Sequence, residues 1–261
     1  MQEGNGCVYL VGAGPGDPEL LTMKANRLLR TADVVIYDRL VSPEVLAMVP
    51  AGIARICVGK QPSHHPIPQD EINLLLVRMA RSNRQVVRLK GGDPFIFGRG
   101  SEEAMELARQ GIRFEIIPGI TAAQGCAAAY HVPLTHRGLA SGVRYLTGHC
   151  QQDLDLDFDW QGLSDPDTTL VIYMGRANIP DIARKLIANG MPADMPVLAI
   201  CNGTTAREQG LATTLRNVAR EIAGSEFEGP VLFIVGKVTA LAKLMEPCNA
   251  SSSEIAATAL A

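Results

Sequence analysis

Charged side chains follow several of the expected strands. Asp38 and Arg39 directly follow the apolar run Val34–Tyr37, and Lys60 follows Gly59. Arg99 stands between two glycines, a position from which its side chain can project into a cleft. A guanidinium group in a cleft can hold an anionic group of a ligand.

Glycine-rich segments follow three of the expected strands and precede helices. They are Gly12–Pro18, Gly91–Ser101 and Pro118–Ala123. Glycines at such positions let the backbone approach a ligand closely, and an open α/β sheet binds its ligands at the carboxyl ends of its strands. We therefore expect one small-molecule crevice. The acids Glu102 and Glu103 also fit a simpler role, because they lie in the first turn of a helix and complement its dipole.

A nucleotide site and a metal site are weaker hypotheses. The dinucleotide fingerprint requires a glycine where this chain has Asp17, although Asp38 stands where a ribose-binding carboxylate would lie. The phosphate-binding pattern GxxxxGK[ST] is absent. The adjacent His64 and His65 have no third ligand spaced near them, so no metal is expected. The six cysteines are scattered and form no CxxC pair, which favours reduced thiols in a cytoplasmic protein.

The composition excludes several classes of protein. The 261 residues are 47% hydrophobic and 20% charged, with a net charge of −3, which is typical of a globular protein. The acidic balance and the aromatic content of 5% argue against a nucleic-acid partner. The apolar runs have the length of strands, so no membrane span is expected. No secretory signal is visible at the N-terminus.

Strand-like and helix-like segments alternate along the chain, which predicts an α/β fold with parallel-rich sheets in both halves. We expect an N-terminal α/β domain over residues 1–132, a C-terminal α/β domain over 133–245, and a disordered tail over 246–261. Asp17 and Pro18 are expected to start the first helix. The acidic segment Cys150–Asp167 is expected to be an irregular surface loop.

The order of the motifs resembles one enzyme family. The chain contains VYLVGAGPGDPELLT, ADVVIYDRLVS, VGKQPSHHPIPQDEIN, VVRLKGGDPFIFGRGSEE, IPGITAA, PLTHRG, VIYMG and EGPVLFIVGKV. This series resembles the uroporphyrinogen-III C-methyltransferases, which are S-adenosylmethionine-dependent tetrapyrrole methylases. The resemblance extends from about Val8 to Leu244, and the stretch RLKGGDPFIFGRGSEE is its most specific part.

The resemblance implies the tetrapyrrole methylase fold, with two α/β domains, the active site between them, and a cytoplasmic homodimer. It implies two methylations of uroporphyrinogen III, at C2 and C7, which give precorrin-2 without a metal. Asp38 and Lys60 match the proton acceptor and donor, and Arg99, Glu102 and Arg137 match residues that contact the tetrapyrrole or assist deprotonation. The positions that match the S-adenosylmethionine site are Pro15, Gly91, Gly92, Asp93, Ile96, Thr121, Ala122, Met174 and Gly203.

The substrate of this family carries eight carboxylates, so an acidic chain needs local cations in its cleft. The candidates are Arg39, Lys60, Arg99, His136 and Arg137. The first expected strand begins at about Val8, so we expect no fused dehydrogenase–ferrochelatase module before it. The pathway that the product feeds, whether sirohaem, cobalamin or haem d1, stays open.

Four alternatives remain open on the sequence. A later corrin-pathway methyltransferase, such as a precorrin-4 C11-methyltransferase, shares the GAGPGDPELLT motif. A nucleotide-binding dehydrogenase is suggested by the glycine loop together with Asp38. An RNA methyltransferase of similar fold fits the acidic charge poorly, and a non-enzymatic binding module remains open for any α/β protein.

Overall fold

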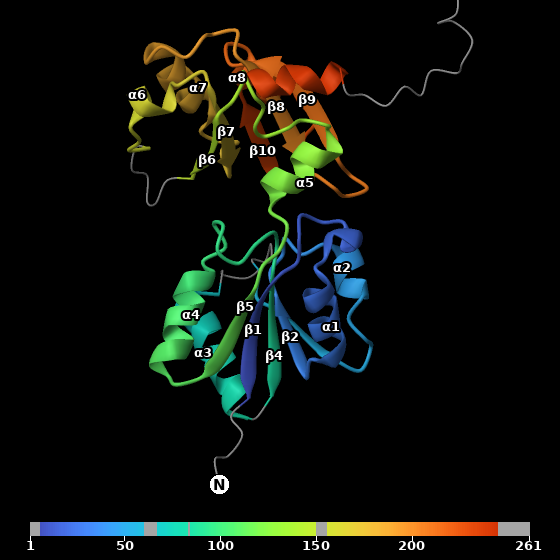
Figure 1. Cartoon of the computed structure of the whole chain (residues 1–261). Coiled ribbons are helices and arrows are strands. Elements are labelled where there is room, and N and C mark those ends of the chain that lie inside the picture. The colour runs from blue at the N-terminus through green and yellow to red at the C-terminus, as the bar shows by residue number, and fades with distance from the viewer. Residues whose placement is uncertain (1–5, 60–66, 83, 150–155, 245–261) are drawn as a thin grey trace, which may run out of the picture.

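The chain folds into two lobes, each built around a five-stranded sheet (Figure 1). The computed structural model describes residues 6–59, 67–82, 84–149 and 156–244. The strands are β1 Cys7–Gly12, β2 Val34–Tyr37, β3 Ala54–Cys57, β4 Gln85–Lys90, β5 Arg113–Ile117, β6 Gly142–Thr147, β7 Thr168–Tyr173, β8 Pro196–Cys201, β9 Gln209–Thr214 and β10 Val231–Val235. The helices are η1 Pro18–Leu20, α1 Met23–Thr31, α2 Pro43–Ala47, α3 Gln69–Arg81, α4 Gly100–Arg109, α5 Ala122–Ala129, α6 Trp160–Leu163, α7 Ile179–Ala188, α8 Val218–Ala223 and η2 Lys237–Leu244.

The sheet of the first lobe is parallel throughout, in the order β3-β2-β4-β1-β5. Its side chains alternate between two buried faces. Val34 and Ile36 pack with α3 and α4 on one face, and Val35 packs with α1 and α2 on the other. Because all strands run the same way, their carboxyl ends meet at one edge, which faces the second lobe (Figure 1).

The sheet of the second lobe is mixed, in the order β6-β7-β10-β8-β9. Only β6 and β7 pair in parallel, while β10 runs antiparallel to β7 and β8, and β9 antiparallel to β8. The expectation of parallel-rich sheets in both halves is therefore wrong for this lobe. Residues 202–208, which join β8 to β9, are too few for the crossover that a parallel pair needs.

Helix α5 follows the first sheet in sequence but packs against the second sheet (Figure 1). Its buried Ala123, Cys126 and Ala127 contact a core that includes Val171 and Ile234. The small side chains let the helix lie close to the sheet. The expected domain boundary between residues 132 and 133 stays a prediction, and we use "first lobe" for residues 6–117 and "second lobe" for residues 122–244.

Two local expectations are corrected by the structure. Asp17 caps the short 3-10 helix η1 rather than a long helix, and the cap of α1 is Thr22, whose hydroxyl accepts a hydrogen bond from Ala25 N. The segment expected to be an irregular loop contains α6, whose Leu163 is buried in the core of the second lobe. The sequence of this segment is polar and acidic, and only a few apolar residues within it indicate a buried helix.

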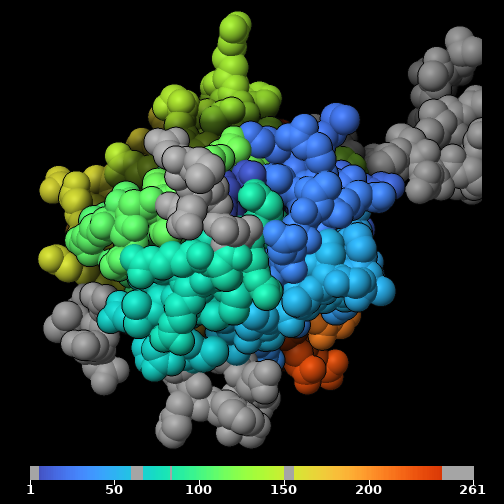
Figure 2. All heavy atoms as spheres, turned by 90° about the horizontal axis from the view of Figure 1, so that it is seen from below, coloured from blue at the N-terminus to red at the C-terminus, as the bar shows by residue number. Residues whose placement is uncertain are grey.

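Some expectations fall on parts of the chain that lie outside the described residues: Lys60, the His64–His65 pair and the tail 246–261. Among the described residues, no helix has the length and apolar character needed to cross a bilayer. In the view from below, the first lobe hides most of the second, whose atoms emerge only at the margins (Figure 2).

Candidate active site

A cavity of about 1000 Å³ lies where the carboxyl edge of the first sheet meets the second lobe. It lies at the upper end of the range for small-molecule sites. The first lobe contributes the loops after β1, β2 and β4, and the second lobe contributes α5 and the loops after β7 and β8. Residues far apart in the sequence therefore share one wall.

All nine positions that match the S-adenosylmethionine site line this cavity. The first lobe supplies Pro15, Gly91, Gly92, Asp93 and Ile96, and the residues from Thr121 onward are Thr121, Ala122, Met174 and Gly203. The spacing of residues in the sequence did not by itself predict that Met174 and Gly203, in the second half of the chain, lie at the same cavity.

The glycines of the three strand-end loops allow these loops to touch one another. A Cβ on Gly119 would lie 2.3 Å from the carbonyl oxygen of Gly92 and 2.8 Å from Cα of Gly12. Gly92 N donates to Gly14 O at 2.7 Å, and Gly14 N donates to Gly92 O at 3.2 Å. The wall of the cavity is therefore backbone held to backbone, a surface that a flat or polar ligand can approach closely.

Asp93 ties two of these loops together. Its Oδ1 accepts a hydrogen bond from Phe95 N at 2.8 Å, and its Oδ2 accepts one from Gly119 N at 3.1 Å. Both carboxylate oxygens thus bind backbone amides, as a charged acceptor does well. Asp93 fixes the shape of the wall that it lines.

Left-handed backbone conformations gather at this cavity. Of the six non-glycine residues with positive φ in the described chain, four line it. They are Phe97 (φ 54°), Arg99 (φ 58°), Met174 (φ 54°) and Asn202 (φ 50°). Each costs on the order of 1–3 kcal/mol and persists only where the surroundings enforce it. Such clustering is typical of functional sites.

The five expected acid–base and substrate residues are not all brought together. Asp38 and Arg99 line the cavity. Glu102 is bound to Arg99 by two hydrogen bonds, Nε to Oε1 at 2.8 Å and Nη2 to Oε2 at 2.7 Å. This hydrogen-bonded guanidinium lowers the pKa of Glu102 below its ordinary value. Arg137 is exposed and does not line the cavity, while Lys60 lies outside the described residues.

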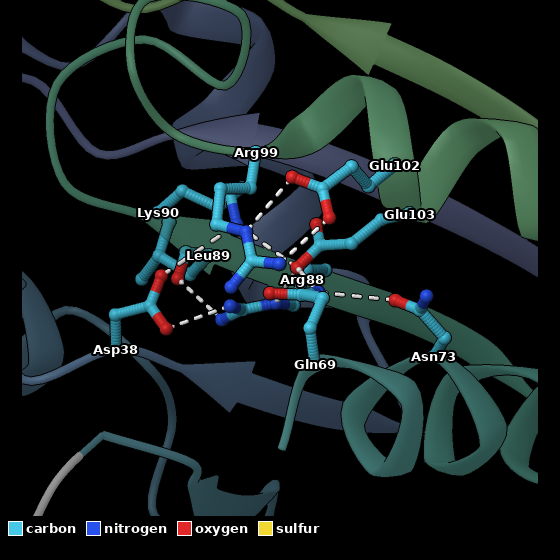
Figure 3. A network of polar contacts seen from close by, with 9 residues as sticks. All are labelled: Asp38, Gln69, Asn73, Arg88, Leu89, Lys90, Arg99, Glu102 and Glu103. Atoms are coloured by element: carbon cyan, nitrogen blue, oxygen red, sulfur yellow. Dashed lines mark hydrogen bonds and ion pairs between the residues drawn. The ribbon is translucent and has the colours of Figure 1, made fainter. Parts of the chain in front are cut away.

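Asp38 belongs to a group of four charged side chains that we call the buried charge cluster: Asp38, Arg88, Lys90 and Glu103 (Figure 3). Arg88 donates to Asp38 Oδ1 at 2.6 Å and to Glu103 Oε1 at 3.0 Å. Lys90 Nζ lies 2.9 Å from Glu103 Oε1 and 3.7 Å from Asp38 Oδ2. Glu103 is fully buried, and Arg88 and Lys90 are almost so.

Burial and the neighbouring positive charge of Arg88 lower the pKa of Lys90, against the attraction of Glu103 and Asp38. The same two carboxylates raise the pKa of Arg88 although burial acts against its charge. Two cations and two carboxylates thus compensate one another where any one of them alone would be costly to bury.

The motifs and spacing did not identify Arg88 and Lys90, and they assigned Glu103 only to the helix dipole. A signal was available, because Arg88 and Lys90 are two residues apart in a strand whose other residues after Gln85 are apolar, and they must share a face. Two cations on one buried face require carboxylates opposite them. The cations at the cavity also differ from those expected from the sequence. Arg39, Arg99, Arg176 and Arg207 line the cavity, whereas His136 and Arg137 do not.

Known proteins share both the sequence and the fold. A family model described as Tetrapyrrole (Corrin/Porphyrin) Methylases matches residues 7–219. Uroporphyrinogen-III C-methyltransferase of Paracoccus denitrificans is 57% identical over 240 residues, covering 92% of this chain and 84% of that protein. Siroheme synthase of Hahella chejuensis is 50% identical over 236 residues, covering 90% of this chain but only 50% of that protein.

A solved structure supports the same assignment. It is uroporphyrin-III C-methyl transferase from Thermus thermophilus complexed with S-adenyl homocysteine, with a TM-score of 0.77 and 43% identity. The match covers 90% of this chain and 100% of that chain. With a family model over most of its length and close relatives over nearly all of it, the chain belongs to the tetrapyrrole methylase family.

Proposed function

We propose that the chain transfers methyl groups from S-adenosylmethionine to C2 and C7 of uroporphyrinogen III, giving precorrin-2. One observation carries the proposal: the nine cofactor positions and Asp38 line a single cavity between the lobes. The relative with 57% identity, which bears the name of this activity, supports it.

The residues of the cavity fit the cofactor. The glycine-rich wall of Gly91, Gly92 and their neighbours offers backbone groups, which suit a ligand with a nucleoside and an amino-acid part. Thr121 and Ala122 begin α5, and Met174 and Gly203 close the site from the second lobe. When bound, S-adenosylmethionine supplies an electrophilic methyl group on a sulfonium ion. The protein contributes orientation and exclusion of water.

The rim of the cavity fits an anionic macrocycle. Arg39, Arg176 and Arg207 line it, and within the described part of the chain none of them has a carboxylate within 4.0 Å. Guanidinium groups bind carboxylates well, and the proposed substrate carries eight carboxylates. The chain carries a net charge of −3, so these arginines supply the local positive potential that the substrate needs.

Asp38 is proposed as the base. A pyrrole carbon that gains a methyl group leaves the macrocycle with one positive charge, and a proton must then depart to restore conjugation. The carboxylate of Asp38 lines the cavity and can accept it. Lys60 as proton donor, and Arg99 and Glu102 as groups that contact the tetrapyrrole, complete the proposal. Arg137 stands apart from the cavity, so we give it no role there.

The dehydrogenase alternative loses its basis. The strand order β3-β2-β4-β1-β5 differs from the 3-2-1-4-5-6 order of the dinucleotide-binding fold. A precorrin-4 methyltransferase remains the competing activity.

The purified chain should be assayed with uroporphyrinogen III and with precorrin-4, each with S-adenosylmethionine, and the products identified by absorbance and mass. We expect a doubly methylated product from uroporphyrinogen III alone. Turnover of precorrin-4 only would overturn the choice of substrate. In calorimetry we expect S-adenosylhomocysteine to bind and NAD not to bind, and tight binding of NAD alone would restore the dehydrogenase.

The homodimer and the cytoplasmic location are kept as proposals from the resemblance. Light scattering on the purified chain measures the mass directly. A mass equal to one chain at micromolar concentration would contradict the homodimer.

A further inference from the structure

We propose that Lys90 and Glu103 are positioning residues that hold the carboxylate of Asp38 in one orientation at the cavity wall. The proposal rests on the proposed function, in which Asp38 accepts a proton from the macrocycle. The motifs gave Lys90 no role and assigned Glu103 only to the helix dipole.

The two cations of the buried charge cluster hold Asp38 from two sides. Arg88 bonds Oδ1 at 2.6 Å, and Lys90 Nζ lies 3.7 Å from Oδ2 (Figure 3). The Asp38 side chain is 30% exposed, whereas those of Arg88 and Lys90 are 2% and 4% exposed. A donating guanidinium and a nearby buried ammonium group thus orient one accessible carboxylate, which is what a base facing a fixed ligand requires.

Glu103 in turn fixes the two cations. Its Oε1 accepts from Arg88 Nε at 3.0 Å, Lys90 Nζ at 2.9 Å and Gln69 Nε2 at 3.3 Å. Its Oε2 has no hydrogen-bond partner within the described chain, and the side chain is fully buried. A buried carboxylate is costly unless it is paired, and Glu103 is paired with both Arg88 and Lys90. Here it balances a second cation, which Asp38 alone could not do.

The charged groups that face Lys90 determine the test. Within the described part of the chain they are Arg88 on its own strand, Asp38 after β2, and Glu103 and Glu102 on α4. On α3, the uncharged Gln69 donates to Glu103 Oε1 and to Asn73 Oδ1. In Glu103→Gln, Lys90 loses its principal counter-charge and so releases its proton at a lower pH than in the wild type. Its hold on Asp38 is present below that pH and lost above it.

The variants are Glu103→Gln, Lys90→Met and the double variant, made in the full chain. For each we would measure kcat and KM for uroporphyrinogen III across pH, the affinity for S-adenosylhomocysteine, and thermal unfolding. For Glu103→Gln we expect kcat to fall about 100-fold, and to fall further as pH rises where the wild type stays level. The affinity for S-adenosylhomocysteine should stay within about twofold, because no residue of the buried charge cluster is among the nine positions that match the S-adenosylmethionine site.

The double variant separates positioning from mere stability. Removing one positive and one negative charge restores neutrality, so it should unfold at a higher temperature than Glu103→Gln and folds even if that single variant does not. Its kcat should nevertheless remain at least about 10-fold low, because Asp38 has lost Lys90. The matched control is Glu106→Gln, the same change on α4 outside the cavity lining, which should leave kcat unchanged.

Wild-type kcat in the double variant, or an unchanged pH profile in Glu103→Gln, would overturn the positioning role while leaving the proposed function intact. A wild-type chain that does not methylate uroporphyrinogen III would instead remove the proposed function, and this role with it. Asp38→Asn serves as the reference. Loss of turnover in this variant, with wild-type activity in the others, would mean that Asp38 is the base and that Lys90 and Glu103 do not position it.

Discussion

At the scale of single residues, the site contains two kinds of ion pair. Arg99 and Glu102 form a half-exposed pair at the rim, with side-chain exposures of 57% and 49%. Such a pair contributes little to stability and can exchange partners with a ligand. Arg88, Lys90 and Glu103 are closed off from water, so their pairing is part of the fold. Substitutions at the two places should therefore have different consequences.

Arg99→Ala should reduce turnover of uroporphyrinogen III about 10- to 100-fold while leaving the affinity for S-adenosylhomocysteine nearly unchanged. A charge-assisted hydrogen bond to a substrate carboxylate contributes about 1.5–3 kcal/mol. Steady-state kinetics and calorimetry measure the two quantities. The control is Arg109→Ala, at the far end of α4 and outside the cavity lining. Equal losses in turnover and in cofactor affinity would contradict a place on the tetrapyrrole side.

Cys126 lines the cavity but should be a poor nucleophile. Burial, followed by the negative charge of Glu208, raises the pKa of its thiol to about 12. At pH 8 only about one such thiol in ten thousand is ionised. Alkylation followed by peptide mass mapping should label the half-buried Cys57 well before Cys126. Faster labelling of Cys126 would show that this thiol is not held in an apolar surrounding.

At the scale of the elements, the ends of strands and the starts of helices form the cavity. Gly92 has φ +67°, and Arg99 caps α4 in the left-handed region. A Cβ on Gly92 would meet no neighbour closer than 3.9 Å. Strain of the backbone, rather than a steric clash, therefore makes glycine necessary there.

Gly92→Val should abolish measurable binding of S-adenosylhomocysteine, because a β-branched residue resists positive φ and the loop must change shape. Calorimetry measures the binding. Gly111→Val is a matched control, since Gly111 has φ +65°, a Cβ there would meet no atom within 4 Å, and the residue lies outside the cavity lining. The control should lose stability but keep its affinity. Unchanged affinity in Gly92→Val would contradict the backbone wall.

Arg99→Gly and Arg99→Ala should be equally slow but differ in stability. Both lose the guanidinium, and only alanine keeps a Cβ at φ 58°. The glycine variant should be more stable by about 1 kcal/mol in denaturant unfolding, because the left-handed conformation costs alanine roughly that much. A less stable glycine variant would mean that α4 begins differently once the arginine is gone.

The sequence allowed the parallel first sheet and the glycine-rich wall of the cavity to be predicted, because both depend on local signals. Apolar runs ending in glycines locate the carboxyl ends of strands, and the motifs added the positions in the second half. The direction of β10 could not be predicted, because it depends on the two strands between which β10 inserts in the sheet. The role of Glu103 was missed for the same reason: its partners lie on β4, and only packing brings α4 and β4 together.

At the scale of the whole molecule, the two lobes meet through a few contacts around the cavity. Asp17 N donates to Thr204 Oγ1 at 3.2 Å, and the rings of Phe97 and Tyr173 lie 5.0 Å apart. These contacts are sparse compared with the cores within each lobe. A ligand that touches both walls would therefore add much of the connection between them.

S-adenosylhomocysteine should raise the thermal midpoint of both lobes together. At one hundred times its dissociation constant, a ligand that binds only the folded chain adds about 2.7 kcal/mol. Calorimetric scans with and without the ligand measure this. Stabilisation of one transition only, with a second left in place, would mean that the ligand contacts a single lobe.

The left-handed residues around the cavity have a consequence for the speed of binding. We expect Phe97, Arg99, Met174 and Asn202 to adopt their costly conformations during folding, because such conformations persist only where the surrounding structure enforces them. The entropy of ordering this wall is thus lost once, and it is not lost again at each encounter. Arrival of the cofactor by diffusion, rather than a slow rearrangement of loops, should set its association rate.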